Sequence, residues 1–384
     1  MASDTACRPR LADILRQHAP AALSADAARV VRDLVACRTP SLGGHQEACD
    51  HCGELRDSYN SCGNRHCPVC QGLEEARWLE RQQADLLPVP YFHVVFTLPA
   101  VLHPLFLGAP RLAYALLFAA AAETLVEVAR RNLQATPGLL IILHTWTQTL
   151  AFHPHLHCLV TGGGLRLDRA AWVATRQTFL LPVRKLRRVF AAKLREKFSA
   201  AAEKGQLRQS LRQTRALLWQ SKKTQWRMYA KAPFAGPQQV LRYLGRYTHR
   251  TAISNERLVS FRDGKVTFSY RDRKHGNTRK QMTLEGPEFT RRFLQHVVPK
   301  GFVRVRHYGI LANPYKRRLL AICRRRLGTP ALATPAKAEP WYELIARLTG
   351  VDPRLCLRCG RGRYLLVREL PRDPLWLTMH TRSP

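Results

Sequence analysis

The apolar and polar positions of this chain follow two periods, which predict strands mixed with helices. Unbroken apolar runs over 91–99 and 138–146 predict buried strands. Residues 111–132 are apolar on nearly every side, as in a buried helix. Over 184–231, basic and apolar positions interleave at helical spacing. The first part of the chain's main domain is therefore expected to pack helices on a sheet.

The second half of the chain adds a hairpin to this pattern. Gly-Pro dipeptides open helical patterns at 235–250 and 286–298, where proline suits the first helical turn. An Asp-Gly pair separates two β-rich runs within 258–273 and predicts a hairpin turn. Residues 301–311 alternate like a strand. Together these elements predict an α+β fold with a mainly antiparallel sheet flanked by helices.

Cysteine and proline are unevenly distributed and divide the chain into five predicted parts. Seven of the 11 cysteines lie within the first 70 residues. The parts are an N-terminal helical arm at 1–29, a cysteine-rich module with a helical joint at 30–87, a main domain at 88–326, a Pro- and Ala-rich linker at 327–340, and a C-terminal tail with a CxxC pair at 341–384.

The net charge of +35, from 62 Lys and Arg against 27 Asp and Glu, indicates an anionic partner. Nucleic acid is the partner that such a basic chain is expected to bind, because Lys and Arg displace the counterions of phosphates. The alternatives are a ribosome-like structural protein and a merely basic surface. The predicted DNA contacts are Arg184, Lys185, Arg187, Arg188, Lys222, Lys223, Arg246 and Arg250.

The apolar segments predict a cytoplasmic protein with no membrane partner. The first 20 residues contain no apolar core of a secretory signal. The most apolar stretch, 112–129, is interrupted by Glu123 and Glu127 and is shorter than a membrane span. The cysteines are therefore expected to be reduced, and clustered cysteines then indicate metal ligands before disulfides.

Two CxxC pairs in the module predict a zinc-ribbon-like site. Cys49 and Cys52 precede Cys67 and Cys70, with fourteen residues between the pairs. Four thiolates can hold structural Zn²⁺ tetrahedrally. A module this short buries little apolar surface, so the metal would supply most of its folding free energy.

Further cysteines leave the number of zinc sites open. Cys62 could replace one of the paired cysteines, or Cys37 and Cys62 could form a second site with a histidine. Cys356 and Cys359 form a late pair that would need two more ligands, and only His380 follows them. The late pair is equally consistent with cysteines that bind no metal.

The stretch "FHPHLHCLVTGGG" (152–164) places two histidines on one face of a predicted strand. Side chains alternate along a strand, so His155 and His157 share a face while Leu156 and Cys158 point to the other. His153 precedes a proline and is expected outside the strand. Two imidazoles on one face can hold a divalent ion and leave coordination positions open, although packed histidines would show the same spacing.

The segment "YLGRYTHR" sets Tyr243 and Tyr247 four residues apart, on one face of a predicted helix. Tyrosines at this spacing are often packing residues. A phenol can also attack a phosphodiester that a divalent ion polarises, which gives a 5′-phosphotyrosine.

The three motifs "HVVFTLP", "HPHLHCLVTGGG" and "YLGRYTHR" follow one another in the order of the HUH endonuclease motifs. With the cysteine module, the chain resembles the rolling-circle, two-tyrosine transposases of the insertion-sequence-91 family. "CRTPSLGGHQEACDHCG" and "SCGNRHCPVCQG" resemble the zinc-binding domain of that family. "YLGRYTHRTAISNERL" and "VRHYGILAN" resemble its transposase domain, so the resemblance covers roughly 30–325.

The resemblance implies a ferredoxin-like or RNA-recognition-like sheet, with the histidines on a central strand and the tyrosines on a neighbouring helix. It implies that His155 and His157 bind Mg²⁺ or Mn²⁺. The third ligand does not transfer from the family pattern, and Gln148 and His249 are the candidates.

The resemblance also implies a bacterial, nucleoid-associated transposase that nicks and transfers single-stranded DNA, with Tyr243 and Tyr247 as nucleophiles. Two alternatives share features with this prediction. A rolling-circle replication initiator or relaxase would use the same chemistry. A non-enzymatic, zinc-dependent DNA-binding regulator would keep the charge and the cysteines, and would use the histidines and tyrosines for packing.

Overall fold

The computed structural model describes residues 8–176, 181–231, 239–240, 245, 251–272, 275–330 and 339–377. All strand pairings between named strands in this part of the chain are antiparallel. The predicted α+β class with antiparallel sheets is therefore confirmed.

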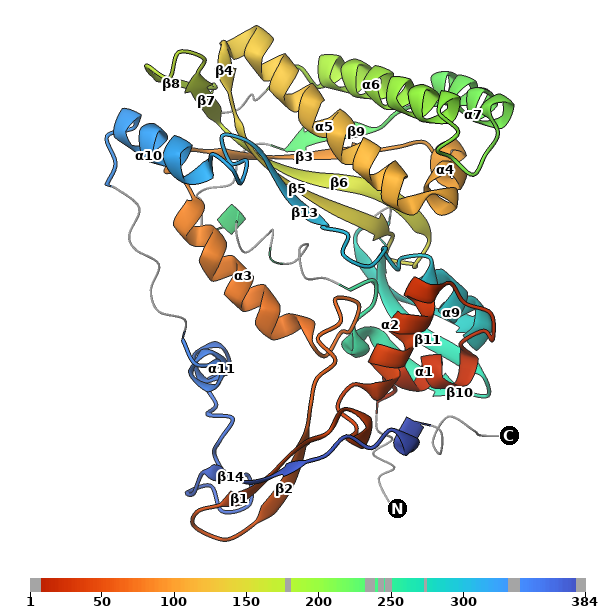
Figure 1. Ribbon diagram of the computed structural model, residues 1–384, viewed down its shortest axis with the longest axis vertical. Coiled ribbons are helices and arrows are strands. Elements are labelled where there is room, and N and C mark those ends of the chain that lie inside the picture. Colours follow the sequence, from red (N-terminus) through yellow and green to blue (C-terminus); the bar gives the residue numbers. More distant parts are fainter. Residues whose placement is uncertain are drawn as a thin grey trace.

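The central sheet has five strands in the order β13-β5-β6-β3-β9 (Figure 1). These strands are β3 (Tyr91–Thr97), β5 (Gly138–Trp146), β6 (Phe152–Thr161), β9 (Met228–Lys231) and β13 (Val305–Gly309). The predicted strand 138–146 is confirmed at both ends.

Strand β6 begins earlier than predicted and includes His153, which corrects its expected place outside the strand. Pro154 lies where the pairing of β5 with β6 shifts register, between the pairs of His144 with His155 and of Trp146 with Phe152. A proline is tolerated there because the ladder is already interrupted.

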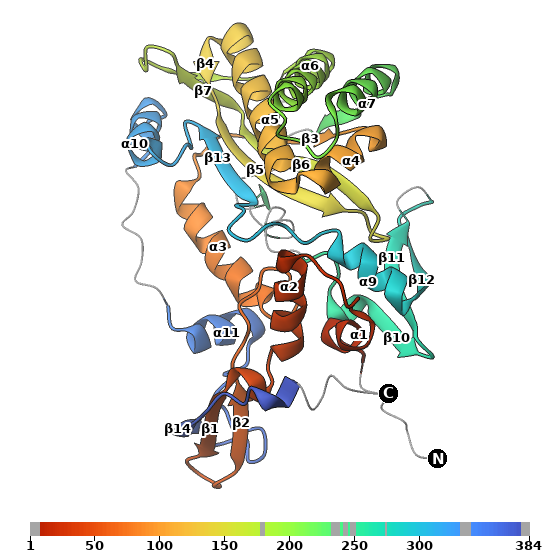
Figure 2. The same cartoon turned by 45° about the vertical axis from the view of Figure 1, so that its right-hand side comes forward.

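One face of this sheet is covered by α4 (His103–Gly108), α5 (Pro110–Leu133), α6 (Val183–Glu203) and α7 (Leu211–Lys223), which Figures 1 and 2 show gathered at one side. Leu156 and Cys158 of β6 pack into the core beneath α5 and α6, as the alternation predicted. Among the described helices, α5 alone is long and apolar enough to cross a membrane, and 61% of its most apolar window is buried within the protein.

The basic stretch 184–231 is two helices and a strand rather than continuous helix. Helix α6 ends at Glu203, and α7 begins after Ser210. Ser210 and Gln213 form a reciprocal capping box, which satisfies N–H groups at the start of α7 and fixes the break.

The other face of the sheet packs on α3 (Gln71–Asp85) and α10 (Lys316–Arg326). Trp78 of α3 and Cys323 of α10 join Leu140 and Leu159 of the sheet in one buried cluster. This cluster covers one end of the face. The other end carries the histidines.

A second group of strands and helices lies beside the central sheet. It consists of β10 (Leu258–Arg262), β11 (Lys265–Asp272), β12 (Thr278–Glu285) and α9 (Gly286–Leu294), packed with α1 (Leu11–His18) and α2 (Ala25–Ala36). Asp263 and Gly264 have φ values of 50° and 69° and form the predicted hairpin turn. Helix α2 crosses the boundary expected between the arm and the module.

At the far end of the molecule, β1 (Gly44–Cys49) pairs with both β2 (Leu55–Tyr59) and β14 (Tyr364–Leu370), next to α11 (Trp341–Thr349) (Figures 1 and 2). The C-terminal tail therefore completes the sheet of the N-terminal module. The remaining short elements are η1 (Pro40–Leu42), η2 (Ala100–Leu102), η3 (Asn255–Arg257), β4 (Ala135–Thr136), β7 (Gly163–Arg166) and β8 (Trp172–Ala174).

Candidate functional site

Three histidines converge on the face of the central sheet opposite α5 and α6. The register of β5 and β6 places His144 directly opposite His155, and Ile142 opposite His157. One ring nitrogen from each of His144, His155 and His157 lies within 4.8 Å of the others. His144 and His157 are buried and His155 is half-buried, so the group is open to solvent mainly at His155.

Hydrogen bonds set the orientation of two of these rings. Nδ1 of His157 lies 2.9 Å from Nε2 of His93, and the two rings stack 5.1 Å apart at 6°. Nδ1 of His155 lies 2.7 Å from the carbonyl oxygen of His153 and must donate to it. A hydrogen at Nδ1 puts the lone pair of an imidazole on Nε2, the arrangement that a metal-binding histidine needs.

The donor set fits a divalent transition ion. Neutral imidazoles suit Mn²⁺ better than Mg²⁺, which prefers oxygen ligands. The Trp146 ring stacks 4.7 Å from His144 at 17° and covers one side of the group.

His144 was missed by sequence reasoning, which offered Gln148 and His249 as third ligands. Gln148 lies in the turn after β5, where its backbone carbonyl accepts a hydrogen bond from Arg257. His249 lies outside the described residues. His144 could have been found only by pairing β5 with β6, because its distance from His155 in the sequence carries no signal.

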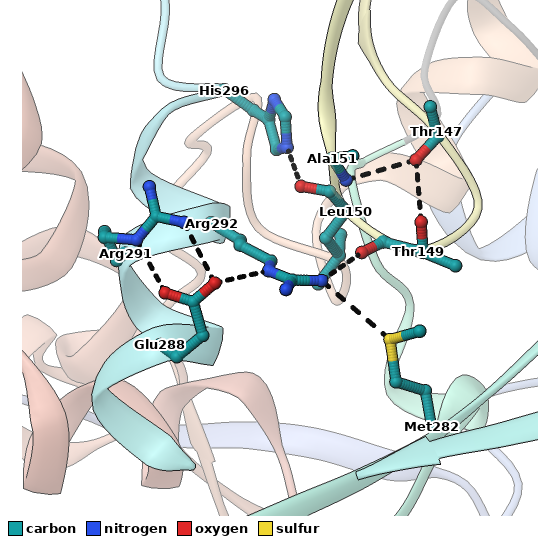
Figure 3. Close-up of polar contacts among 9 residues, drawn as sticks. All are labelled: Thr147, Thr149, Leu150, Ala151, Met282, Glu288, Arg291, Arg292 and His296. Atoms are coloured by element: carbon teal, nitrogen blue, oxygen red, sulfur yellow. Dashed lines mark hydrogen bonds and ion pairs between the residues drawn. The ribbon is translucent and has the colours of Figure 1, made fainter. Parts of the chain in front are cut away.

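The turn between β5 and β6 is held by the segment around α9 (Figure 3). Nε2 of His296 donates to the Leu150 carbonyl at 3.1 Å, and Nδ1 of His296 accepts from the Thr145 hydroxyl at 3.2 Å. Leu150 has a φ of 60°, a conformation that its side chain disfavours. Burial lowers the pKa of His296 to about 4, so this ring is neutral near pH 7.

An arginine clamp holds the same turn from the other side. Arg292 donates to the Thr149 carbonyl at 3.2 Å and pairs with Glu288 at 2.7 Å. Arg291 and Arg292 both bond to Glu288 and lower the pKa of its carboxyl group to about 2. The strand that carries His155 therefore begins from a fixed turn.

The predicted nucleophiles Tyr243 and Tyr247 lie outside the described residues, as do Arg246 and Arg250. Two neighbouring positions are described. Val240 is buried in the cluster that contains Trp78 and Leu140, on the histidine side of the sheet. A Cβ at Gly245 would come within 2.8 Å of the Leu79 side chain on α3. The backbone at these two positions therefore lies along that side of the sheet.

The first sulfur cluster joins Cys37, Cys62, Cys67 and Cys70. Measured sulfur separations are 3.6 Å for Cys37 with Cys70, 3.6 Å for Cys37 with Cys67, and 3.7 Å for Cys62 with Cys70. Four sulfurs bound tetrahedrally at the Zn–S length of 2.3 Å would lie about 3.8 Å apart. The donors and spacing fit one zinc ion.

The second sulfur cluster corrects the predicted ligand set. Cys49 and Cys52 lie with Cys356 and Cys359, not with Cys67 and Cys70. The two CxxC pairs of the module thus belong to different clusters, and the late pair has its two missing partners. A signal was available in the sequence: the first and last pairs are each followed by glycine, whereas Cys70 is followed by Gln71.

Basic side chains line a groove of about 1070 Å³ between the start of α6 and residues 224–226. Its lining includes four of the predicted DNA contacts: Arg184, Lys185, Arg187 and Arg188. Among the described residues, none of these four forms an ion pair, whereas Lys193 and Lys197 further along α6 pair with Glu123 and Glu127. The groove lies on the side of the sheet that α5 and α6 cover, opposite the face that carries the histidines.

Two more of the predicted DNA contacts lie at the end of α7. Lys222 and Lys223 are exposed, and Nζ of Lys223 lies 3.8 Å from the ring centre of Trp219. Trp219 is 55% exposed, which offers an aromatic face beside two positive charges.

Two families match separate parts of the chain. Residues 8–98 match a family described as "Transposase zinc-binding domain", and residues 138–318 match one described as "Putative transposase". The chain is 45% identical over 378 residues to "Putative transposase y4qJ" of Sinorhizobium fredii (strain NBRC 101917 / NGR234), which covers 94% of this chain and 95% of that protein. It is 30% identical over 345 residues to "Transposase for insertion sequence element IS801" of Pseudomonas savastanoi pv. phaseolicola, which covers 86% of this chain and 81% of that protein. No solved structure matches the chain.

Proposed function

Because the chain belongs to the insertion-sequence-91 family of transposases, we propose that it nicks and transfers single-stranded DNA through a 5′-phosphotyrosine intermediate in rolling-circle transposition. Its catalytic fold is of the HUH endonuclease type. The five-stranded antiparallel sheet with helices packed on it, and the histidines on the central strand β6, support this assignment.

The observation that carries the proposal is the convergence of His144, His155 and His157 on one sheet face. A DNA-binding regulator has no need for three imidazoles within 4.8 Å of one another beside a buried partner such as His93. We assign the three histidines as ligands of a divalent ion, Mn²⁺ or Mg²⁺. When bound, the ion polarises the scissile phosphate and eases departure of the 3′ oxygen.

The tyrosines supply the nucleophile in this mechanism. The phenolic oxygen of Tyr243 or Tyr247 attacks the phosphorus, and the bond from phosphorus to the 3′ oxygen breaks. The phenol gives up its proton to solvent, and the departing 3′ oxygen takes one up. The 5′ phosphate stays on tyrosine until another 3′ hydroxyl attacks it, which restores the phenol without hydrolysis. Two tyrosines allow two strands to be processed in turn.

The basic groove on α6 would bind the DNA backbone at a site distant from the reacting phosphate. Arg184, Lys185, Arg187 and Arg188 form no ion pair with a described acidic residue, and Trp219 offers a face for base stacking. A strand that reaches both the groove and the histidines must bend around the sheet, because the two sites lie on opposite faces. This geometry favours single-stranded DNA, which bends easily.

Zinc at Cys37, Cys62, Cys67 and Cys70 has a structural part in this proposal. The cluster ties α2 to the start of α3, since Cys37 follows α2 and Cys70 precedes α3. DNA is the proposed partner, and the bacterial nucleoid in the cytoplasm is the proposed location. A replication initiator or relaxase shares the chemistry, and the family membership favours the transposase.

The proposal is tested by incubating the protein with a labelled single-stranded oligonucleotide that carries an end of the mobile element, with Mn²⁺ or Mg²⁺. A covalent protein–DNA adduct on a denaturing gel is expected. His144→Ala and the double variant Tyr243→Phe/Tyr247→Phe should make none.

His153→Ala is the matched control, because it keeps the backbone carbonyl that binds His155 and should keep the adduct. An adduct made by the double tyrosine variant would show that the nucleophile is misassigned. Full activity in His144→Ala would show that His144 is not a ligand of the ion. If the wild-type protein forms no adduct on any element end, a DNA-binding regulator explains the protein better than an active transposase.

A further inference from the structure

We propose that Cys49, Cys52, Cys356 and Cys359 bind a second structural zinc ion, which fastens the C-terminal tail to the N-terminal module. The matched zinc-binding family covers residues 8–98 and therefore contains only half of this site. The other half lies more than 300 residues further along the chain.

The sulfur positions match tetrahedral zinc and not disulfide bonds. Sγ of Cys49 lies 3.7 Å from Sγ of Cys359, and Sγ of Cys52 lies 3.8 Å from Sγ of Cys356. Tetrahedral Zn–S bonds of 2.3 Å place sulfurs about 3.8 Å apart. A disulfide would bring two sulfurs to about 2.05 Å.

The two halves of the site have the same backbone turn. In each half a CxxC pair is followed by a glycine, and the glycine N–H bonds to the carbonyl of the first cysteine: Gly53 to Cys49 at 3.0 Å, and Gly360 to Cys356 at 2.9 Å. The two glycines have φ values of 70° and 64°, which only glycine adopts readily. The same turn at two positions distant in the sequence indicates that the two cysteine pairs bind one ion.

Backbone N–H groups also point at sulfur in both halves. The N–H of Cys52 lies 3.5 Å from Sγ of Cys49, and the N–H of Gly362 lies 3.4 Å from Sγ of Cys359. Such bonds stabilise thiolates, the form that binds zinc. A Cβ at Gly362 would lie 2.5 Å from Sγ of Cys49, so a side chain there would collide with the cluster.

Besides the cluster, the tail contacts the module mainly through polar groups, such as the ion pair of Arg358 with Glu54 and the hydrogen bond from the Arg363 N–H to Asp50. The buried residues around the cluster are Cys49, Cys356 and Tyr364, a core of three side chains. The pairing of β14 with β1 and the stacking of Arg56 on Tyr364 at 3.8 Å orient the tail. Leu365, Leu366 and Val367 of β14 remain more than half exposed. A core this small needs a metal for its stability.

Zinc counting tests the proposal without any DNA reaction, so its outcome is separate from that of the transposase mechanism. The purified full-length protein, dialysed against metal-free buffer, should carry two zinc ions per chain by mass spectrometry of the metal. Cys356→Ser/Cys359→Ser should carry one zinc ion fewer. The matched control Cys158→Ala/Cys323→Ala changes two buried cysteines outside both clusters and should keep both ions. An unchanged zinc content in Cys356→Ser/Cys359→Ser would overturn the proposal.

A second measurement uses the native cysteines and does not depend on how well that variant folds. A site for a specific protease is introduced into the linker 327–340, and the protein is cut there. The 341–384 fragment should co-elute with the rest of the chain on size exclusion, and should separate when a zinc chelator is added. Co-elution that survives complete removal of zinc would overturn the proposal.

Discussion

Replacement of His296 by leucine should destabilise the protein by an amount that depends on pH. His296 is 1% exposed and bonds through both ring nitrogens, to the Leu150 carbonyl, which Figure 3 shows, and to the Thr145 hydroxyl. His296→Leu leaves both partners buried without a hydrogen bond. At about 1–3 kcal/mol for each of the two partners, the free energy of unfolding should fall by about 2–6 kcal/mol at pH 7.5.

The pH dependence follows from the lowered pKa of this ring. The pKa of His296 falls from 6.5 in the unfolded chain to about 4 in the folded protein, because burial disfavours the charged imidazole. Between these values the unfolded state takes up a proton that the folded state does not. Stability from this group is therefore complete above pH 6.5 and is lost as pH falls toward 4. At 1.36 kcal/mol for each pKa unit, the loss from pH 7.5 to pH 5 is about 2 kcal/mol.

The variant has no ring to titrate, so the difference between wild type and His296→Leu should be about 2 kcal/mol smaller at pH 5 than at pH 7.5. Urea unfolding followed by tryptophan fluorescence measures both values, and Trp146 lies 5.9 Å from His296. Other titrating groups and both cysteine clusters contribute equally to the two proteins and cancel. Phe152→Leu, which removes a ring stacked on His296, should show the same difference at both pH values. An equal difference for His296→Leu at both pH values would refute the reasoning.

Two other changes have defined outcomes. Arg187→Ala/Arg188→Ala should weaken binding to single-stranded DNA and reduce the slope of log affinity against log salt by about 1.4, at about 0.7 for each lost phosphate contact. The control Lys193→Ala/Lys197→Ala, on the same helix but paired with acidic residues, should leave the slope unchanged. An equal change of slope in both variants would contradict the assignment of the groove. His93→Leu should lower the affinity of the protein for Mn²⁺ about 10- to 100-fold, because His157 loses the partner of its Nδ1. Electron paramagnetic resonance measures this affinity, and an unchanged value would show that His93 does not orient His157.

Strands of both the central sheet and the β10–β11 hairpin could be predicted because they are defined locally. The apolar run of β5 matches its structural bounds, and the Asp263-Gly264 turn has the φ values that its sequence demands. The alternation in β6 correctly separated His157 from Leu156. The break in the basic stretch was missed, although Ser210 and Gln213 carry the signature of a helix start.

The sites could be predicted only in part, because they depend on pairing between distant strands. His144 joins His155 and His157 through the register of β5 with β6, which the sequence does not reveal without the fold. The cysteine pairs were grouped by their distance along the chain, which joined Cys52 to Cys67. The antiparallel pairing of β1 with β14 instead brings Cys52 to Cys356.

The pairing of β1 with β14 also has a consequence for biosynthesis. Cys49 and Cys359 are separated by 310 residues. A ribosome adds about 5–20 residues each second, so β1 leaves the ribosome about 15–60 s before the strand that pairs with it. During that interval one edge of β1 and two thiols are without their native neighbours, while the central sheet can already form. A polypeptide that stops before Cys356 thus contains the whole central sheet and still lacks a finished module, because the module needs residues that are translated after that sheet.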